Sequence, residues 1–123
     1  MQIVERAVGD VAVLDLDGRL IAGDGDQQLV ETVNRLAQAG GRKVLLNLDA
    51  VTYIDSAGLG AIVSKFITLR KRDGHLKLCN LRVRSFRVLN ITRLLTVLES
   101  FDSEVEAIQS FADQGSSEQG VRS

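Results

Sequence analysis

The stretch that decides the fold is residues 43–60, which read KVLLNLDAVTYIDSAGLG. Its first six residues, 43–48, form a nearly continuous apolar run, which is typical of a central strand buried on both faces. A short loop is expected to lead to residues 51–54, and a helix is expected to begin near Ser56. The stretch therefore predicts a buried strand that passes almost directly into a helix.

The segments before this stretch predict a hairpin and a first helix. Residues 3–16 read as two strands with a turn between them, and Asp17-Gly18 is expected to close the second strand. From residue 26 onward the apolar period becomes that of an amphipathic helix, which the glycines at 40–41 are expected to stop. The candidate N-caps of this helix are Asp24 and Asp26.

The segments after the stretch alternate between helix and strand patterns. A strand over residues 75–79, a short helix over 82–90 and a strand over 97–101 are expected, and Ser103 opens a capping box for a last helix. The order β-β-α-β-α-β-α-β-α predicts the α/β class. We expect a single domain whose mixed sheet, an N-terminal hairpin followed by βαβ units, packs with about four helices. The expected buried stripe of the second helix is Leu59, Ile62, Val63, Phe66 and Leu69.

The bulk composition indicates one ordinary globular domain. The chain has 123 residues, of which 45% are hydrophobic and 25% are charged, so residues 1–113 can bury one core. Residues 114–123 are polar and small, which predicts a flexible tail. No apolar run approaches the roughly 20 residues that cross a bilayer, no signal peptide opens the chain, and the single cysteine, Cys79, fits a reducing compartment. A cytoplasmic location without direct membrane insertion is therefore expected.

The sequence lacks the conventional catalytic and cofactor sets, so no enzymatic activity, cofactor or metal is expected. The one histidine, His75, shares a predicted strand with Cys79 but lies roughly 13 Å from it, too far to act as a pair. The glycines within residues 58–60 suggest a dinucleotide loop, but Val63 stands where the third glycine belongs. Asp55 suggests a phospho-aspartate receiver, but such a protein begins with a βαβ unit and needs further acids for magnesium.

Residues 47–60 resemble the central signature of STAS domains, especially that of the anti-sigma factor antagonists. That signature is close to L-x-x-(apolar)-x-x-(apolar)-D-S-(small)-G-L-G, and the resemblance extends over about residues 11–111. It includes the turn at residues 17–20 and the strand over 74–78. The resemblance implies a STAS domain over residues 1–113 that acts by binding protein partners.

The resemblance also implies a mechanism. In this family, the serine after the motif aspartate is phosphorylated by an anti-sigma factor that is itself a serine kinase. The unphosphorylated antagonist binds the anti-sigma factor in a partner-switching pathway that frees the sigma factor for transcription, and a PP2C-type phosphatase restores the serine. Matched to this sequence, the phosphoacceptor is Ser56. The implied partner-binding residues are Asp24, Asp55, Ser56, Ala57, Gly58, Leu59 and Gly60.

The physical chemistry of a helix start is compatible with such a switch. A serine at this position lies near unpaired N–H groups and the positive end of the helix dipole, which accept an anion. A phosphate of roughly −1.5 to −2 charge on Ser56, beside Asp55, would concentrate negative charge with little change of fold. The alternative for an isolated Asp-Ser pair is that Ser56 only caps the helix.

Two departures from the family pattern bear on partner recognition. Ala57 stands where many relatives carry Ser or Thr, so a second hydroxyl is absent. After Gly18, many antagonists have an acidic residue followed by Leu and Asp, whereas residues 19–21 of this chain read Arg-Leu-Ile. Asp24, in the glycine-containing loop over residues 22–26, is the candidate replacement for the missing acid.

Other functions stay open at this stage. The alternative to an antagonist is a STAS scaffold without phosphorylation, as an adaptor subunit of a transporter or a multi-protein signalling assembly. Residues 65–93 hold nine of the 15 basic residues and one acid, Asp73, which reads as solvated helix faces or as a binding patch. Nucleic-acid binding is not expected, because the aromatic content is 4% and the net charge is −1. It would have to use Arg82, Arg84, Arg87 and Arg93. No pattern specifies the oligomeric state.

Overall fold

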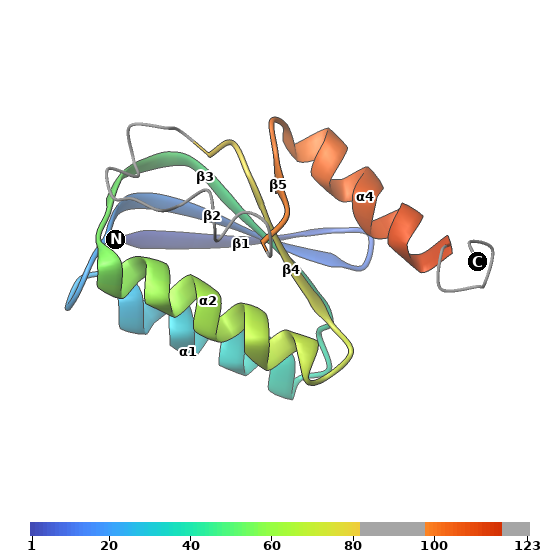
Figure 1. Ribbon diagram of the computed structural model, residues 1–123, viewed down its shortest axis with the longest axis horizontal. Coiled ribbons are helices and arrows are strands. Elements are labelled where there is room, and N and C mark those ends of the chain that lie inside the picture. Colours follow the sequence, from blue (N-terminus) through green and yellow to red (C-terminus); the bar gives the residue numbers. More distant parts are fainter. Residues whose placement is uncertain (82–97, 117–123) are drawn as a thin grey trace.

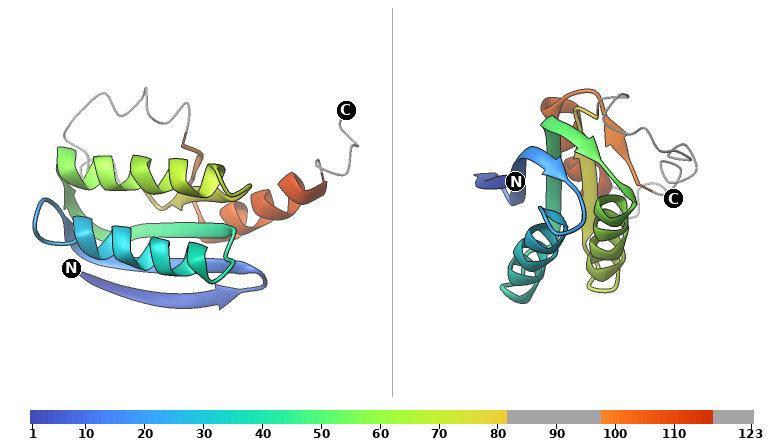
Figure 2. Two further views of the ribbon diagram at one scale, coloured as in Figure 1. Left: turned by 90° about the horizontal axis from the view of Figure 1, so that it is seen from below. Right: turned by 90° about the vertical axis from the view of Figure 1, so that its left-hand side faces the viewer.

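The computed structural model describes residues 1–81 and 98–116 of the chain. Two helices, α1 and α2, lie on one side of a β-sheet, and a third helix, α4, lies on the other (Figure 1). Figure 2 shows α1 and α2 side by side along the sheet. In chain order the elements are β1 (Gln2–Val8), β2 (Val11–Leu20), α1 (Asp26–Gln38), β3 (Lys43–Ile54), α2 (Ser56–Arg70), β4 (His75–Cys79), β5 (Ser100–Phe101) and α4 (Glu104–Ser116).

The sheet is mixed, as the hairpin followed by crossover helices predicted. Its five strands have the order β1-β2-β3-β4-β5. Strands β1 and β2 pair antiparallel, whereas β2 with β3, β3 with β4 and β4 with β5 pair parallel. Strand β3 therefore lies at the centre, and α1 and α2 both begin at the end of the sheet where β3 finishes (Figure 1). This arrangement brings two helix starts together beside one strand end.

The two faces of β2 and β3 contribute to two separate apolar clusters, because successive side chains of a strand point to opposite faces. Leu14 and Leu46 are fully buried in the cluster under α1 and α2. Their neighbours Val13 and Leu45 are fully buried in a smaller cluster that includes Phe111 of α4. The prediction that residues 43–48 form a strand buried on both faces is confirmed.

The predicted loop before residue 51 and the predicted end of the second strand at Asp17-Gly18 are both wrong. Strand β3 continues without a break to Ile54, because β2 also continues, to Leu20, and pairs with it. The register shifts twice along this extension, and Gly18 has a φ of 117°. A glycine admits that conformation without a Cβ clash, so the bulged strand stays paired where a local pattern indicates a turn.

The described residues contain three helices instead of the expected four or so. The predicted short helix over residues 82–90, and the start of the strand predicted over 97–101, lie outside the described residues. Strand β5 begins at Ser100. The predicted cap of the last helix is confirmed, because the N–H of Glu106 donates to the Ser103 hydroxyl at 3.2 Å. Within the two described ranges, no helix combines the length and apolarity that crossing a bilayer requires.

Candidate functional site

Asp55 holds together the turn between β3 and α2. It is the N-cap of α2, and its carboxylate accepts a hydrogen bond from the Gly58 N–H at 2.8 Å. The second carboxylate oxygen accepts from the Ala22 N–H, in the loop before α1, at 3.1 Å. These bonds, the one from Gly58 foremost, hold the pKa of the Asp55 carboxyl below its usual range. Asp55 therefore connects two chain segments that the sequence separates widely.

Ser56 is the first residue of α2, and its side chain is exposed. Asp55 supplies the side-chain cap, so the interpretation that Ser56 only caps the helix is wrong. Within residues 1–81 and 98–116, the Ser56 hydroxyl forms no hydrogen bond. The serine therefore presents an available hydroxyl at the positive end of a helix, where an added anion is stabilised.

Gly58 allows the start of α2 to touch β2. A Cβ at this position would lie 2.0 Å from the carbonyl oxygen of Leu20, far inside any tolerable contact. The same carbonyl accepts a hydrogen bond from the Asp55 N–H at 3.3 Å. Gly60 is exposed, and a Cβ there would meet open space. Gly58 therefore permits a close approach between the backbones of α2 and β2, whereas Gly60 has no such constraint from the described residues.

The outer side of α2 carries a shallow groove that begins at Ser56. Ile62 and Leu69 of the predicted stripe are fully buried, whereas Leu59, Val63 and Phe66 are only partly buried. Ile67 is 46% exposed. The apolar side chains of α2 therefore extend beyond the side of the helix that faces the sheet. The groove has a volume of about 680 Å³ and is lined by Ser56, Leu59, Gly60, Val63, Ser64, Ile67, Thr68 and Lys71.

The loop before α1 places Asp24 near this end of the sheet but occupies its carboxylate. One oxygen of Asp24 accepts from the amino group of Met1 at 2.8 Å, and the other lies 3.6 Å from the Arg19 guanidinium. The Met1 amino group is the main cause of the lowered pKa of Asp24. The candidate replacement for the missing family acid is therefore already paired with cations.

The predicted N-caps of α1 are wrong. The cap position is Gly25, with a φ of 115° and no side-chain cap. Asp26 is the first residue of the helix, and one oxygen of its carboxylate accepts from the N–H groups of Gly23 and Gln27, at 3.0 and 2.8 Å. The carboxylate therefore stabilises the loop instead of capping from outside the helix.

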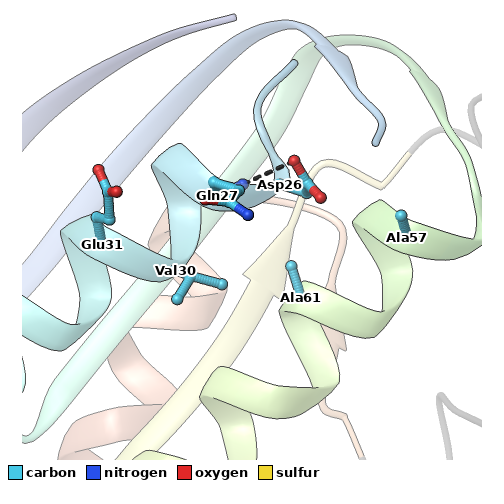
Figure 3. A pocket seen from close by; sticks show the side chains of 6 residues that line it. All are labelled: Asp26, Gln27, Val30, Glu31, Ala57 and Ala61. Carbon is cyan, nitrogen blue, oxygen red and sulfur yellow. Dashed lines mark hydrogen bonds between the residues drawn. The ribbon is translucent and has the colours of Figure 1, made fainter. Parts of the chain in front are cut away.

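A second groove lies between the first turns of α1 and α2 (Figure 3). Its volume is about 400 Å³, and it is lined by Asp26, Gln27, Val30, Glu31, Ala57 and Ala61. Sequence reasoning singled out only Ala57 of these as a binding residue. Neighbouring acids on an amphipathic helix are common, so nothing in the local pattern of α1 distinguishes Asp26 or Glu31 from an ordinary solvated face.

The lone histidine and cysteine lie at the two ends of β4. Cys79 is buried, and burial raises the pKa of its thiol to about 11, so little thiolate exists near neutral pH. Within the described ranges, no three His, Cys, Asp or Glu side chains are grouped so that they could hold a metal ion. The candidate site is the exposed start of α2 around Ser56, together with the two grooves that adjoin it.

The basic segment over residues 65–93 is only partly a solvated face. Lys65 and Lys77 are buried, and their ammonium groups donate to Asn34 at 2.7 Å and to Ser110 at 2.8 Å. Arg72 donates to a carbonyl of α1 at 3.2 Å. The prediction of solvated cations is therefore wrong for the two lysines. The arginines named for nucleic-acid binding, Arg82, Arg84, Arg87 and Arg93, lie outside the described residues.

The chain as a whole matches a known protein family. The model of the STAS domain matches residues 2–107, so the chain belongs to the STAS domain family. It is 22% identical to the anti-sigma F factor antagonist of Paenibacillus polymyxa over 98 residues, 80% of this chain and 84% of that relative. It is 41% identical to the anti-sigma-B factor antagonist of Listeria monocytogenes over 61 residues, about half of each chain (50% and 54%).

A solved structure supports the same relationship. A candidate anti-sigma factor antagonist of Thermotoga maritima superposes with a TM-score of 0.80 at 26% identity, over 88% of this chain and 92% of that one. The chain is thus similar to anti-sigma factor antagonists in both sequence and fold.

Proposed function

We propose that this protein is an anti-sigma factor antagonist in a partner-switching pathway that regulates transcription. It binds an anti-sigma factor that is a serine kinase, through the exposed start of α2 and the adjoining loop. Phosphorylation of Ser56 releases that partner, and a PP2C-type phosphatase reverses the modification. The proposal rests on the similarity to antagonists and on the arrangement of Asp55 and Ser56.

One observation carries the proposal, namely the division of roles between these two neighbours. Asp55 forms the cap and the loop contact, so Ser56 can be modified without removing a bond that holds α2. The hydroxyl is exposed at the helix start, where a kinase can reach it. A phosphate there adds roughly −1.5 to −2 charge beside the Asp55 carboxylate. Binding at this surface would then require desolvating a concentrated negative charge, which is costly.

The test uses the chain as bait in native lysate, with wild type, Ser56→Ala and Ser56→Asp compared by mass spectrometry. Wild type and Ser56→Ala are expected to capture a serine-kinase-like anti-sigma factor, and Ser56→Asp is expected to bind it about tenfold more weakly or not at all. The purified partner is expected to phosphorylate wild type with ATP but not Ser56→Ala.

The matched control is Ser100→Asp, which adds the same charge to an exposed serine of the edge strand β5, outside both grooves. It is expected to retain binding, because the added charge is remote from the helix start. Equal binding by wild type and Ser56→Asp would contradict the switch. Capture of the same membrane or scaffold proteins by all baits would instead make the domain a constitutive adaptor.

A further inference from the structure

The groove between α1 and α2 adjoins the phosphoacceptor. Ala57, which follows Ser56 directly, lines it together with Ala61 of α2 and Val30 of α1. Figure 3 shows Val30 and Ala61 facing each other across the space between the two helices. Ala57 and Ala61 are one helical turn apart, and their small side chains leave the groove open. A partner residue that enters the groove would therefore lie next to Ser56.

The groove has an apolar floor and a polar, acidic rim. Val30, Ala57 and Ala61 provide the carbon surface, whereas Asp26, Gln27 and Glu31 provide the polar groups. In Figure 3 the Asp26 carboxylate lies on the same side of the groove as Ala57. The Glu31 side chain points away from Ala57. Within the described residues, neither carboxylate has a cation within 4.0 Å. The rim therefore carries negative charge, and no cation of the described residues neutralises the Asp26 carboxylate, which is the one on the side of Ala57.

The Asp26 carboxylate is positioned so that one oxygen stays available. Both backbone bonds, from Gly23 and from Gln27, go to the same oxygen, Oδ1. Within the described part of the chain, Oδ2 accepts no hydrogen bond. The carboxylate is therefore held in orientation by the loop while it presents an acceptor, beside the Gln27 amide, to an incoming donor.

A lysine already occupies the next turn between the same two helices. Lys65 and Asn34 each lie four residues beyond a lining residue, Ala61 and Val30 respectively. Lys65 is only 6% exposed, and its ammonium donates to the Asn34 amide oxygen at 2.7 Å. The space between α1 and α2 therefore accommodates a long cationic side chain whose stem packs on carbon and whose head reaches a polar group of α1.

We propose that the groove receives one arginine side chain of the partner that approaches Ser56. Its aliphatic stem packs on Val30, Ala57 and Ala61, and its guanidinium donates to Asp26 Oδ2 and to the Gln27 amide oxygen. Arginine fits better than lysine, because its planar group can donate to two acceptors at once and is less strongly hydrated. Glu31 adds attraction at longer range. The identity of the partner as the anti-sigma factor rests on the proposed function, whereas the preference for a guanidinium does not.

The first experiment tests the groove with a defined probe. N-acetyl-L-arginine amide is titrated into the ¹⁵N-labelled full chain and followed by amide chemical shifts, beside its neutral isostere N-acetyl-L-citrulline amide. The arginine compound is expected to shift the signals of Gln27, Ala57 and Ala61, and the citrulline compound is expected to bind about fivefold more weakly or not at all. Equal shifts with both compounds would overturn the proposal.

The matched variants separate the specific carboxylate from general negative charge. Asp26→Asn keeps an acceptor for the two backbone N–H groups but removes the charge, so arginine binding is expected to fall about fivefold. Glu106→Gln removes an exposed acid from α4, on the opposite face of the sheet, and is expected to leave binding unchanged. Unchanged arginine binding to Asp26→Asn would also overturn the proposal.

A second experiment measures binding of the captured anti-sigma factor to wild type and to Asp26→Asn. The variant is expected to bind about tenfold more weakly, with a smaller dependence on salt. If the variant binds like wild type, the groove inference fails while the proposed function stands. If no kinase is captured but the arginine compound binds through Asp26, the proposed function fails and the guanidinium site stands.

Discussion

The sheet face that carries α1 and α2 is closed mainly by aliphatic side chains, whereas the face that carries α4 depends on charged side chains as well. On the first face, the start of α2 touches β2 through Gly58 with no room for a methyl group. On the second, Arg6 of β1 donates to Asp15 at 2.5 Å and to Glu104 of α4 at 2.7 Å. The placement of Ser56 therefore depends on close packing, and that of α4 depends partly on ion pairs.

The largest effect is expected from Gly58→Ala, which tests close packing on the α2 face. The added methyl group would lie 2.0 Å from the Leu20 carbonyl oxygen, so α2 or β2 must shift. The free energy of unfolding is expected to fall by about 3 kcal/mol, at the upper end for overpacked cores. Urea unfolding followed by circular dichroism measures the change.

Gly60→Ala is the matched control for this variant, because its methyl group meets open space in the same helix. It is expected to raise the free energy of unfolding by about 0.5–1 kcal/mol, since alanine has the higher helix propensity. Similar losses in both variants would show that the close contact with Leu20 is not the cause.

A smaller effect is expected from Arg6→Met, which tests the ion pairs under α4. Arg6 is 39% exposed, so solvent screens its bonds to Asp15 and Glu104. The free energy of unfolding is expected to fall by about 1 kcal/mol at low salt, and by less at about 1 M salt. Unfolding curves at the two salt concentrations measure this difference.

Lys43→Met is the control for Arg6→Met, because it removes a single exposed ion pair, to Asp10, from the same sheet. Its cost is expected to be under about 0.5 kcal/mol at either salt concentration. If Arg6→Met lost the same small amount, the ion pairs of Arg6 would not contribute to holding α4.

The smallest effect is expected from lowering the pH, which protonates the Asp55 carboxylate that caps α2. Its pKa is lowered in the folded protein, mainly by the Gly58 N–H. The stabilisation is therefore present above the unfolded pKa of about 3.9, and is lost as the pH falls through the lower folded value. The stability difference between wild type and Asp55→Asn is expected to narrow from pH 5 to pH 3, as measured by urea unfolding. If the stability difference between wild type and Asp55→Asn stayed constant over this pH range, the charge of the Asp55 carboxylate would not be what stabilises the cap.

Local patterns predicted much of the fold and the centre of the site. The buried strand over residues 43–48, the start of α2 at Ser56 and the Ser103 cap were all predicted, because they follow from periodicity and capping within a few residues. The strand ends at Gly18 and before Val51 were predicted wrongly. There, pairing between β2 and β3 overrode turn-forming residues, which is a tertiary effect.

The sequence by itself determined the order of the described elements, the family and the position of Ser56 at the start of α2, because these depend on residue types at short spacing. Only the tertiary structure decided what the neighbouring residues do. The bond from Ala22 to Asp55 joins residues 33 positions apart, and that from Lys65 to Asn34 joins residues 31 apart. Such contacts exist only after β2 and β3 have paired and α1 and α2 have packed together. No short-range pattern encodes which side chains then meet, so the capping role of Asp55, the constraint on Gly58 and the groove beside Ala57 emerge from the fold.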